Sequence, residues 1–155
     1  MATKPTWQAV RSEPPGPHAL VTRTPTPADA TAEETLTPSL SELLIRSAVG
    51  LRDRTAVQAL VEEDKLLSRD NVRTALVSKQ NGVMTCRWES VAKRTHTLGL
   101  DDGEQAFLEL VLSIAGIRQS YLTAVALLDE RRLKILLQAL TRLACNDRIA
   151  IGTRV

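Results

Sequence analysis

Basic side chains are concentrated between residues 65 and 94, where only two acidic residues, Asp70 and Glu89, accompany them. The basic residues of this segment are Lys65, Arg69, Arg73, Lys79, Arg87, Lys93 and Arg94. Seven positive charges against two negative ones give the segment +5, whereas the whole chain carries only +2. Because clustered Lys and Arg side chains neutralise phosphate groups, this segregation of charge predicts contact with nucleic acid.

Two helices are predicted on either side of Ser68, over Asp53–Leu67 and Arg69–Gln80. Such a pair has the outline of a helix-turn-helix, in which the start of the second helix reads base edges. The candidate nucleic-acid-binding residues are Arg69, Asn71, Arg73, Thr74, Lys79, Arg87, Lys93 and Arg94. The turn lacks the glycine often found there, and basic residues on a solvated helix face need no ligand. A binding surface and an ordinary solvated face are therefore both compatible with the sequence.

Catalytic chemistry is not predicted, because the sequence supplies few of the necessary groups. Cys86 and His96 are the only Cys and His near each other in sequence. On one helix they would lie about 15 Å apart, which is too far for a nucleophile and its base. No His, Cys, Asp or Glu residues have metal-ligand spacing, and no glycine cluster forms a phosphate loop. We therefore expect a non-catalytic regulatory or accessory protein without a metal or cofactor.

The prolines divide the chain into two parts. All seven fall within the first 38 residues, and eight threonines lie in residues 1–37. Proline lacks an amide proton and clashes within helices, so this composition opposes regular structure. The sequence predicts a flexible, disordered Pro/Thr-rich arm over residues 1–37 and a single helical domain over residues 38–155.

The arm supports a second hypothesis, a helical adaptor or assembly subunit that binds another protein or a second copy of itself. The apolar residues that could anchor the arm are Trp7, Val10, Leu20 and Val21. A solvated tail without a function is the other interpretation, because termini are loose unless something holds them.

The composition favours helices. Hydrophobic residues make up 43% of the chain and charged residues 25%, as in ordinary soluble domains. Aromatic residues are only 3%, so Leu, Val, Ile and Ala must form the core. The predicted fold is mainly α, a small orthogonal bundle of five or six helices.

The sequence also predicts a cytoplasmic location. Its two cysteines, Cys86 and Cys145, lie 59 positions apart, which is not a disulfide framework. No secretory signal is recognisable at the N-terminus. The longest apolar stretch, Ala106–Ala115, is much shorter than the roughly 20 residues that span a bilayer, so no membrane partner is expected.

Helix signals recur along residues 38–155. A capping box is predicted at Ser39 and Glu42, and Gly116 should end the helix that contains Ala106–Ala115. Eight residues of Ala106–Ala115 are apolar, so protein should surround this central helix on nearly all sides. Besides the pair described above, helices are predicted over residues 39–49, from the residues after Asp101 and Asp102 through Ala115, and over residues 123–128. Asp129 is predicted to cap a last helix that ends near Cys145.

In the last of these helices an apolar stripe is expected to face the core, and the basic residues to face elsewhere. The inward residues are Leu133, Leu136, Leu137, Leu140 and Ala144, and the outward ones are Arg131, Arg132, Lys134, Gln138 and Arg142.

Residues 83–98 allow two interpretations. Asn81-Gly82 followed by Val83 favours a short β-hairpin near residue 82. Met84, Trp88, Val91 and Ala92 instead keep helical spacing. The helix is the preferred prediction and the hairpin the alternative.

Overall fold

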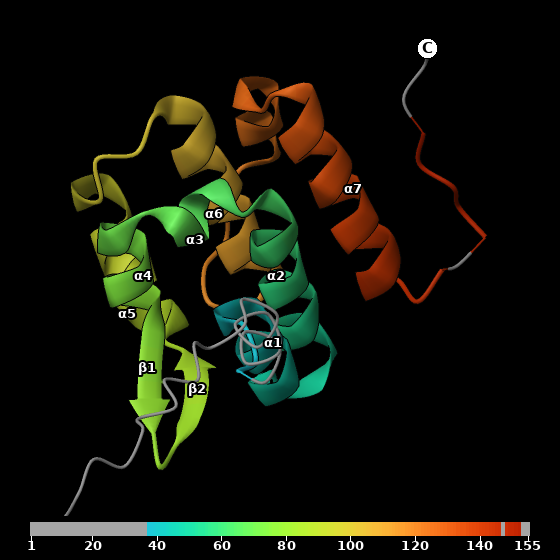
Figure 1. Cartoon of the computed structure of the whole chain (residues 1–155). Coiled ribbons are helices and arrows are strands. Elements are labelled where there is room, and N and C mark those ends of the chain that lie inside the picture. Colours follow the sequence, from blue (N-terminus) through green and yellow to red (C-terminus); the bar gives the residue numbers. More distant parts are fainter. Residues whose placement is uncertain (1–36, 147, 153–155) are drawn as a thin grey trace, which may run out of the picture. The chain divides into compact units, whose positions relative to one another are not determined.

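The structure, a computed structural model, describes residues 37–146 and 148–152. The predicted N-terminal arm therefore lies outside the described residues, apart from Thr37. Within them the chain forms seven α-helices, two 3₁₀ helices and one two-stranded antiparallel sheet (Figure 1). The prediction of a small, mainly helical fold with a short hairpin near Gly82 is confirmed.

Helix α1 covers Leu40–Ser47 and begins with the predicted capping box. The Ser39 hydroxyl accepts a hydrogen bond from the Glu42 amide at 3.2 Å, and the Glu42 carboxylate accepts one from the Ser39 amide at 2.9 Å. Helix α2, Gly50–Glu63, begins three residues earlier than predicted. Asp53 does not start it; its carboxylate accepts a hydrogen bond from the Val49 amide at 2.8 Å.

The predicted helix pair around Ser68 is wrong in its boundaries. Asp64 has a positive φ of 63° and ends α2, and a short helix α3, Lys65–Ser68, follows. Helix α4 covers only Asp70–Leu76, so the chain has three helices where two were predicted. At this break the Glu63 carboxylate accepts a hydrogen bond from the Leu66 amide, in the first turn of α3, at 2.8 Å.

Strands β1, Val77–Gln80, and β2, Val83–Cys86, form the hairpin, with Val77 paired to Cys86 and Gln80 to Val83. The preferred prediction of a helix over residues 83–98 is therefore wrong for its first part. Asn81 and Gly82 have φ values of 49° and 82°, which a tight two-residue hairpin turn requires. Turn chemistry thus outweighs the helical spacing of Met84, and helix α5, Trp88–Arg94, begins only after the strand.

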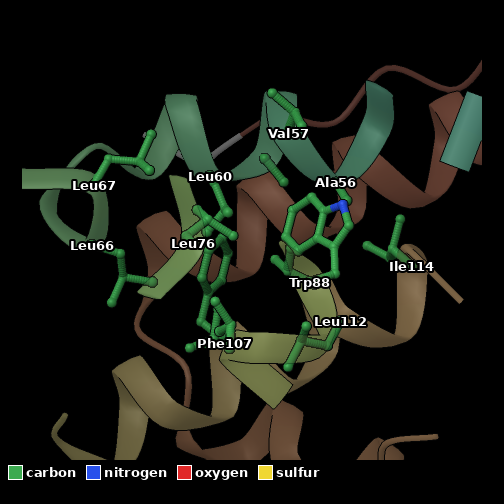
Figure 2. Packing of buried hydrophobic residues seen from close by; sticks show 14 of the residues in the cluster. Ala56, Val57, Leu60, Leu66, Leu67, Leu76, Trp88, Phe107, Leu112 and Ile114 are labelled. Carbon is green, nitrogen blue, oxygen red and sulfur yellow. The ribbon is translucent and has the colours of Figure 1, made fainter. Parts of the chain in front are cut away.

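Helix α6, Asp102–Ile114, is the central helix, as predicted. Phe107, Leu108, Val111 and Leu112 have no exposed surface, and α2, α5, α7 and the 3₁₀ helices η1 and η2 surround it. Figure 2 shows Phe107 and Leu112 among apolar side chains of α2, α3, α4 and α5. The helix begins with a capping box between Asp101 and Glu104, the second of which is itself buried. Helix η1 covers Thr95–Thr97, and η2 covers Leu122–Leu127.

Helix α7, Glu130–Leu143, begins at the predicted cap, where the Asp129 carboxylate accepts a hydrogen bond from the Arg132 amide at 2.7 Å. The predicted inward stripe is right for Leu136 and wrong for Leu137, Leu140 and Ala144, which are exposed. Arg132, predicted to face elsewhere, is buried. The buried residues are Arg132, Ile135, Leu136 and Ala139. Leu137 and Leu140, expected to face inward, are 39% and 43% exposed. Residues 149–152 form no strand.

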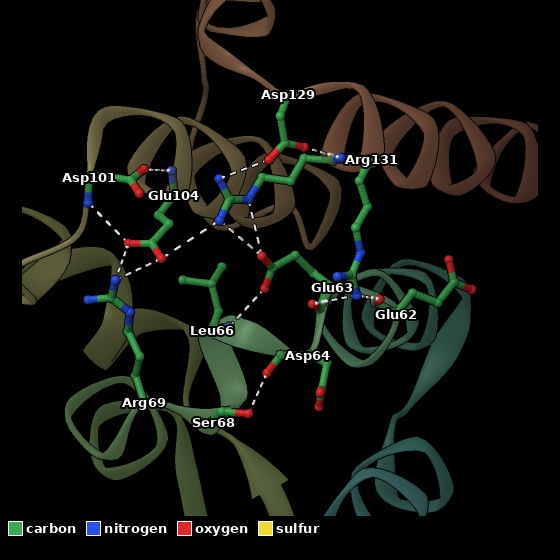
Figure 3. Close-up of polar contacts among 11 residues, drawn as sticks. Glu62, Glu63, Asp64, Leu66, Ser68, Arg69, Asp101, Glu104, Asp129 and Arg131 are labelled. Carbon is green, nitrogen blue, oxygen red and sulfur yellow. Dashed lines mark hydrogen bonds and ion pairs between the residues drawn. The ribbon is translucent and has the colours of Figure 1, made fainter. Parts of the chain in front are cut away.

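Arg132 is buried because two carboxylates already lie in the core. Its guanidinium group is 3.1 Å from the Glu63 carboxylate and 3.7 Å from that of Glu104. A third carboxylate, of Asp129, lies 3.4 Å away. Figure 3 shows these contacts, which join the end of α2 to the starts of α6 and α7. The charged cluster therefore determines which face of α7 is directed inward.

Candidate nucleic-acid interface

The start of α4, predicted to read bases, is bound to the segment before α6 and to the first turn of α6. Arg69 precedes the helix, and its guanidinium group lies 2.7 Å from the Glu104 carboxylate (Figure 3). A second nitrogen of Arg69 donates to the Gly99 carbonyl at 3.1 Å. The Asn71 side-chain amide donates to the carbonyl of Leu98. A nucleic acid would have to compete with these partners for both side chains.

Arg73 and Thr74 lie farther along the same helix and are exposed. Arg73 forms an ion pair with Asp70, one turn earlier, and the two side chains are 50% and 85% exposed. The charge of Arg73 is therefore balanced locally. Arg87 directly follows β2, and its guanidinium group donates a hydrogen bond to the Thr74 carbonyl at 3.2 Å, so it links the end of the hairpin to α4.

The remaining predicted residues lie on the hairpin and on α5. Lys79 is exposed on β1, opposite Met84 of β2. Arg87, Lys93 and Arg94 line one open hollow with a volume of about 570 Å³. The structure thus brings three of the eight predicted residues together at one site, whereas the others lie outside its lining.

Two further hollows adjoin the first, because they share lining residues with it. One, of about 430 Å³, is lined by Lys93 and Arg118, and the other, of about 290 Å³, by Arg118 and Arg52. Ile117, in the loop after α6, lines all three. We call this connected depression the basic hollow, and its cations are Arg52, Arg87, Lys93, Arg94 and Arg118.

Positive charge dominates the lining of the basic hollow. Its five cations are accompanied by a single acidic residue, Glu89. None of the five cations forms an ion pair with another described residue, whereas Arg69 and Arg73 do. Unpaired cations in a depression attract anions, and phosphate groups are a suitable size for such contacts.

Arg52 and Arg118 were not among the residues predicted from the sequence. They belong to the start of α2 and the loop after α6, far from residues 65–94 along the chain. Gly116, with φ +81°, turns the chain after α6, and a Cβ atom there would lie 2.9 Å from the Arg52 guanidinium group. Arg118 thus lines one hollow with α5 residues, and Arg52 lies next to the turn. Gly116 allowed the end of α6 to be predicted from the sequence, but it gave no indication that Arg52 lies next to it.

Polar contacts fix the floor of the basic hollow. The indole nitrogen of Trp88 donates to the Asp53 carboxylate at 2.7 Å, and Trp88 is 8% exposed. Burial, together with the charge of Asp53, raises the pKa of the Cys86 thiol from 9.0 to about 12. The Cys86 thiol is therefore protonated at neutral pH. Because a nucleophilic cysteine reacts as the thiolate, Cys86 is a poor nucleophile at this pH.

The second candidate for acid–base chemistry, His96, is exposed in η1. Its ring nitrogen Nδ1 lies 3.0 Å from the side-chain amide of Gln105. In residues 37–146 and 148–152, no three His, Cys, Asp or Glu side chains come together as a metal site. None of the helices in the described part of the chain is both long and apolar enough to cross a membrane.

Comparison with known proteins gives no relative: no family model, curated protein or solved structure matches this chain.

Proposed function

We propose that this protein is a non-catalytic regulatory or accessory protein that binds nucleic acid through the phosphate backbone, in the basic hollow. The observation that supports this proposal is the convergence of five cations from α2, α5 and two loops around one depression. Three of them, Arg87, Lys93 and Arg94, were singled out by the charge pattern of the sequence.

Backbone contact is favoured over the reading of bases. In the helix-turn-helix mode the first residues of the second helix face base edges. Here Arg69 and Asn71 already bind Glu104, Gly99 and Leu98. Lys93, Arg94 and Arg118 have no such partners among the described residues, and point charges of this kind recognise phosphate without sequence information. We therefore expect binding that depends weakly on base sequence and strongly on salt.

The salt dependence gives a quantitative expectation. Each phosphate contact with duplex DNA contributes about −0.9 to the slope of log K against log salt, so five contacts give about −4.5. Replacing Lys93 and Arg94 by Gln should make the slope shallower by about 2 and weaken binding at low salt. Fluorescence anisotropy of a labelled duplex DNA, a single-stranded DNA and an RNA, at about 50 to 200 mM salt, measures both effects.

The matched control removes the same charge elsewhere. Lys65 lies in the same basic segment as Lys93, and Lys134 lies on α7. Neither Lys65 nor Lys134 lines the basic hollow. The double change Lys65→Gln and Lys134→Gln should leave the salt slope nearly unchanged. An equal loss in both double variants would show that only net charge matters. Undetectable binding at about 50 mM salt would refute the proposal and leave the adaptor hypothesis.

A further inference from the structure

Helix α7 carries an apolar stripe that the core of the domain does not use. Leu133, Leu137, Leu140 and Ala144 are spaced by four, three and four residues, the spacing of a coiled-coil seam. Leu137 and Leu140 are 39% and 43% exposed, because the charged cluster around Arg132 directs another face of the helix inward. The most regular apolar face of α7 is therefore left without a partner in the described part of the chain.

An apolar groove runs beside this stripe, between α7, η2 and α6. Its volume is about 290 Å³, and its lining includes Leu110, Leu122, Val125, Leu133, Leu137 and Leu140. Leu122, on η2, is 80% exposed at the groove. An apolar cavity of about 150 Å³ can hold a benzene molecule, so this groove has room for one or two aliphatic side chains.

We propose that a second copy of this chain covers the groove and that two α7 helices pack antiparallel about a two-fold axis. A two-fold interface must be self-complementary, because the same patch faces itself. This patch meets that condition: Leu137 and Leu140 are partly exposed and border a groove that has room for the same leucines of a second copy. This inference is independent of nucleic-acid binding and goes beyond it.

The stripe sets the register. With the axis between Leu137 and Leu140, each Leu137 packs against Leu140 of the second copy, and each Leu133 against Ala144. The charged residue nearest the seam is Glu130, which continues the stripe three residues before Leu133. Its two copies would lie about 25 Å apart along the helices, so salt screens their repulsion.

The size of the patch predicts a weak dimer. The 14 residues of α7 give a length of about 21 Å, and α7 with the adjoining groove is about two helix diameters, or 20 Å, wide. The resulting footprint is on the order of 400 Å² per copy, about half of the 800 Å² per partner in a standard stable interface. We expect reversible association with a dissociation constant in the micromolar range.

Sedimentation velocity of the full chain without nucleic acid, from about 1 to 500 µM, tests this proposal. The mass should rise from 17.0 kDa toward twice that value as concentration increases. Leu137→Glu and Leu140→Glu should each stay monomeric, whereas the control Val83→Glu should dimerise normally. Val83 is also exposed, at 50%, but lies on the hairpin, at lower left in Figure 1 with α7 on the right. A wild-type protein that is monomeric throughout, or an undiminished dimer of Leu140→Glu, would overturn the proposal.

A cross-link tests the register in a variant that keeps the apolar seam. In Cys145→Ser, a further Leu137→Cys change places two thiols across the axis, about 4.5 Å apart along the helices. Helix axes about 8–10 Å apart, with each Cα about 2.3 Å from its axis, add a lateral offset that brings the Cα–Cα distance to about 6–7 Å. Mild oxidation should produce a covalent dimer, because this distance lies at the upper end of the range of disulfide geometry, about 4.4–6.8 Å. The two native Cys145 residues would lie roughly 20 Å apart and should not link in the wild-type dimer. A dimer in which position 137 fails to link would refute the antiparallel α7 contact. Both tests are done without nucleic acid, so their outcome does not depend on whether the proposed nucleic-acid binding is correct.

Discussion

The buried charge cluster allows a specific prediction about stability, tested by Arg132→Met. Arg132 lies between the carboxylates of Glu63 and Glu104, and all three residues are at most 7% exposed. Methionine fills similar space but leaves both carboxylates without this cation. Removing one partner of a buried ion pair costs about 3–5 kcal/mol, since a buried charge then lacks compensation. Small domains have about 5–15 kcal/mol in total, so the variant should lose about a fifth of its stability or more.

Urea unfolding followed by circular dichroism measures the effect. With a slope of about 2 kcal/mol per M, the midpoint should fall by roughly 2 M. The control is Arg142→Met, whose partner Glu62 lies 2.6 Å away but whose ion pair is exposed, at 38% and 33% of the two side chains. Exposed pairs contribute about 0–1 kcal/mol, so the control should change little.

A second substitution tests whether the loss comes from the uncompensated charge. Glu63→Gln removes one buried charge while keeping an oxygen that can accept the hydrogen bond from the Leu66 amide. The double variant Glu63→Gln/Arg132→Met should therefore be more stable than Arg132→Met alone. A loss below about 1 kcal/mol in Arg132→Met, or losses that simply add in the double variant, would refute this account of the cluster.

Three further predictions concern the thiols and the glycines. Iodoacetamide at pH 8 should label the exposed Cys145 rapidly and the folded Cys86 slowly, as peptide mass spectrometry would show. The pKa of Cys86 is raised from 9.0 in the unfolded chain to about 12 in the folded protein, so the unfolded thiol ionises first as pH rises. The free energy of unfolding should therefore fall by at most about 1.4 kcal/mol per pH unit between pH 9 and 12. The urea midpoints of Cys86→Ser should lack this pH-dependent loss. Gly82→Ala should cost about 1–2 kcal/mol of stability because of its positive φ alone, since nothing lies within 4 Å of the new Cβ atom. Gly103→Ala should instead destabilise the protein through contact with the Leu127 carbonyl, 3.0 Å from the new Cβ atom. Thermal melting of the two variants compares these effects.

Local signals in the sequence predicted the ends of several helices. Ser39 with Glu42, Asp101 and Asp129 are caps whose hydrogen bonds form within four residues, so no knowledge of the remaining chain is needed. The central position of α6 was also predictable, because a helix that is apolar on nearly all sides must be enclosed.

The errors occur where a contact between distant residues decides the outcome. Helix α2 ends at Glu63, whose carboxylate accepts hydrogen bonds from the Leu66 amide and from Arg132, 69 positions later. A residue pattern within α2 could not reveal that partner, and the helix was therefore extended to Leu67. The same reason explains the missed Arg52 and Arg118, which reach the basic hollow only through the packing of α2 and the turn at Gly116.

The misassigned stripe of α7 follows from a more general limit. Periodicity shows which face of a helix is apolar but not which part of the molecule covers it. In α7 the buried face includes a charged residue, Arg132, because Glu63 and Glu104 provide its countercharges, and Leu137 and Leu140 are displaced toward the surface. In the monomer, the exposed leucines of α7 contribute less hydrophobic free energy than they would if they were buried. Burying them against a second copy would recover that hydrophobic free energy, so the feature that sequence reasoning misassigned is also the strongest argument for self-association.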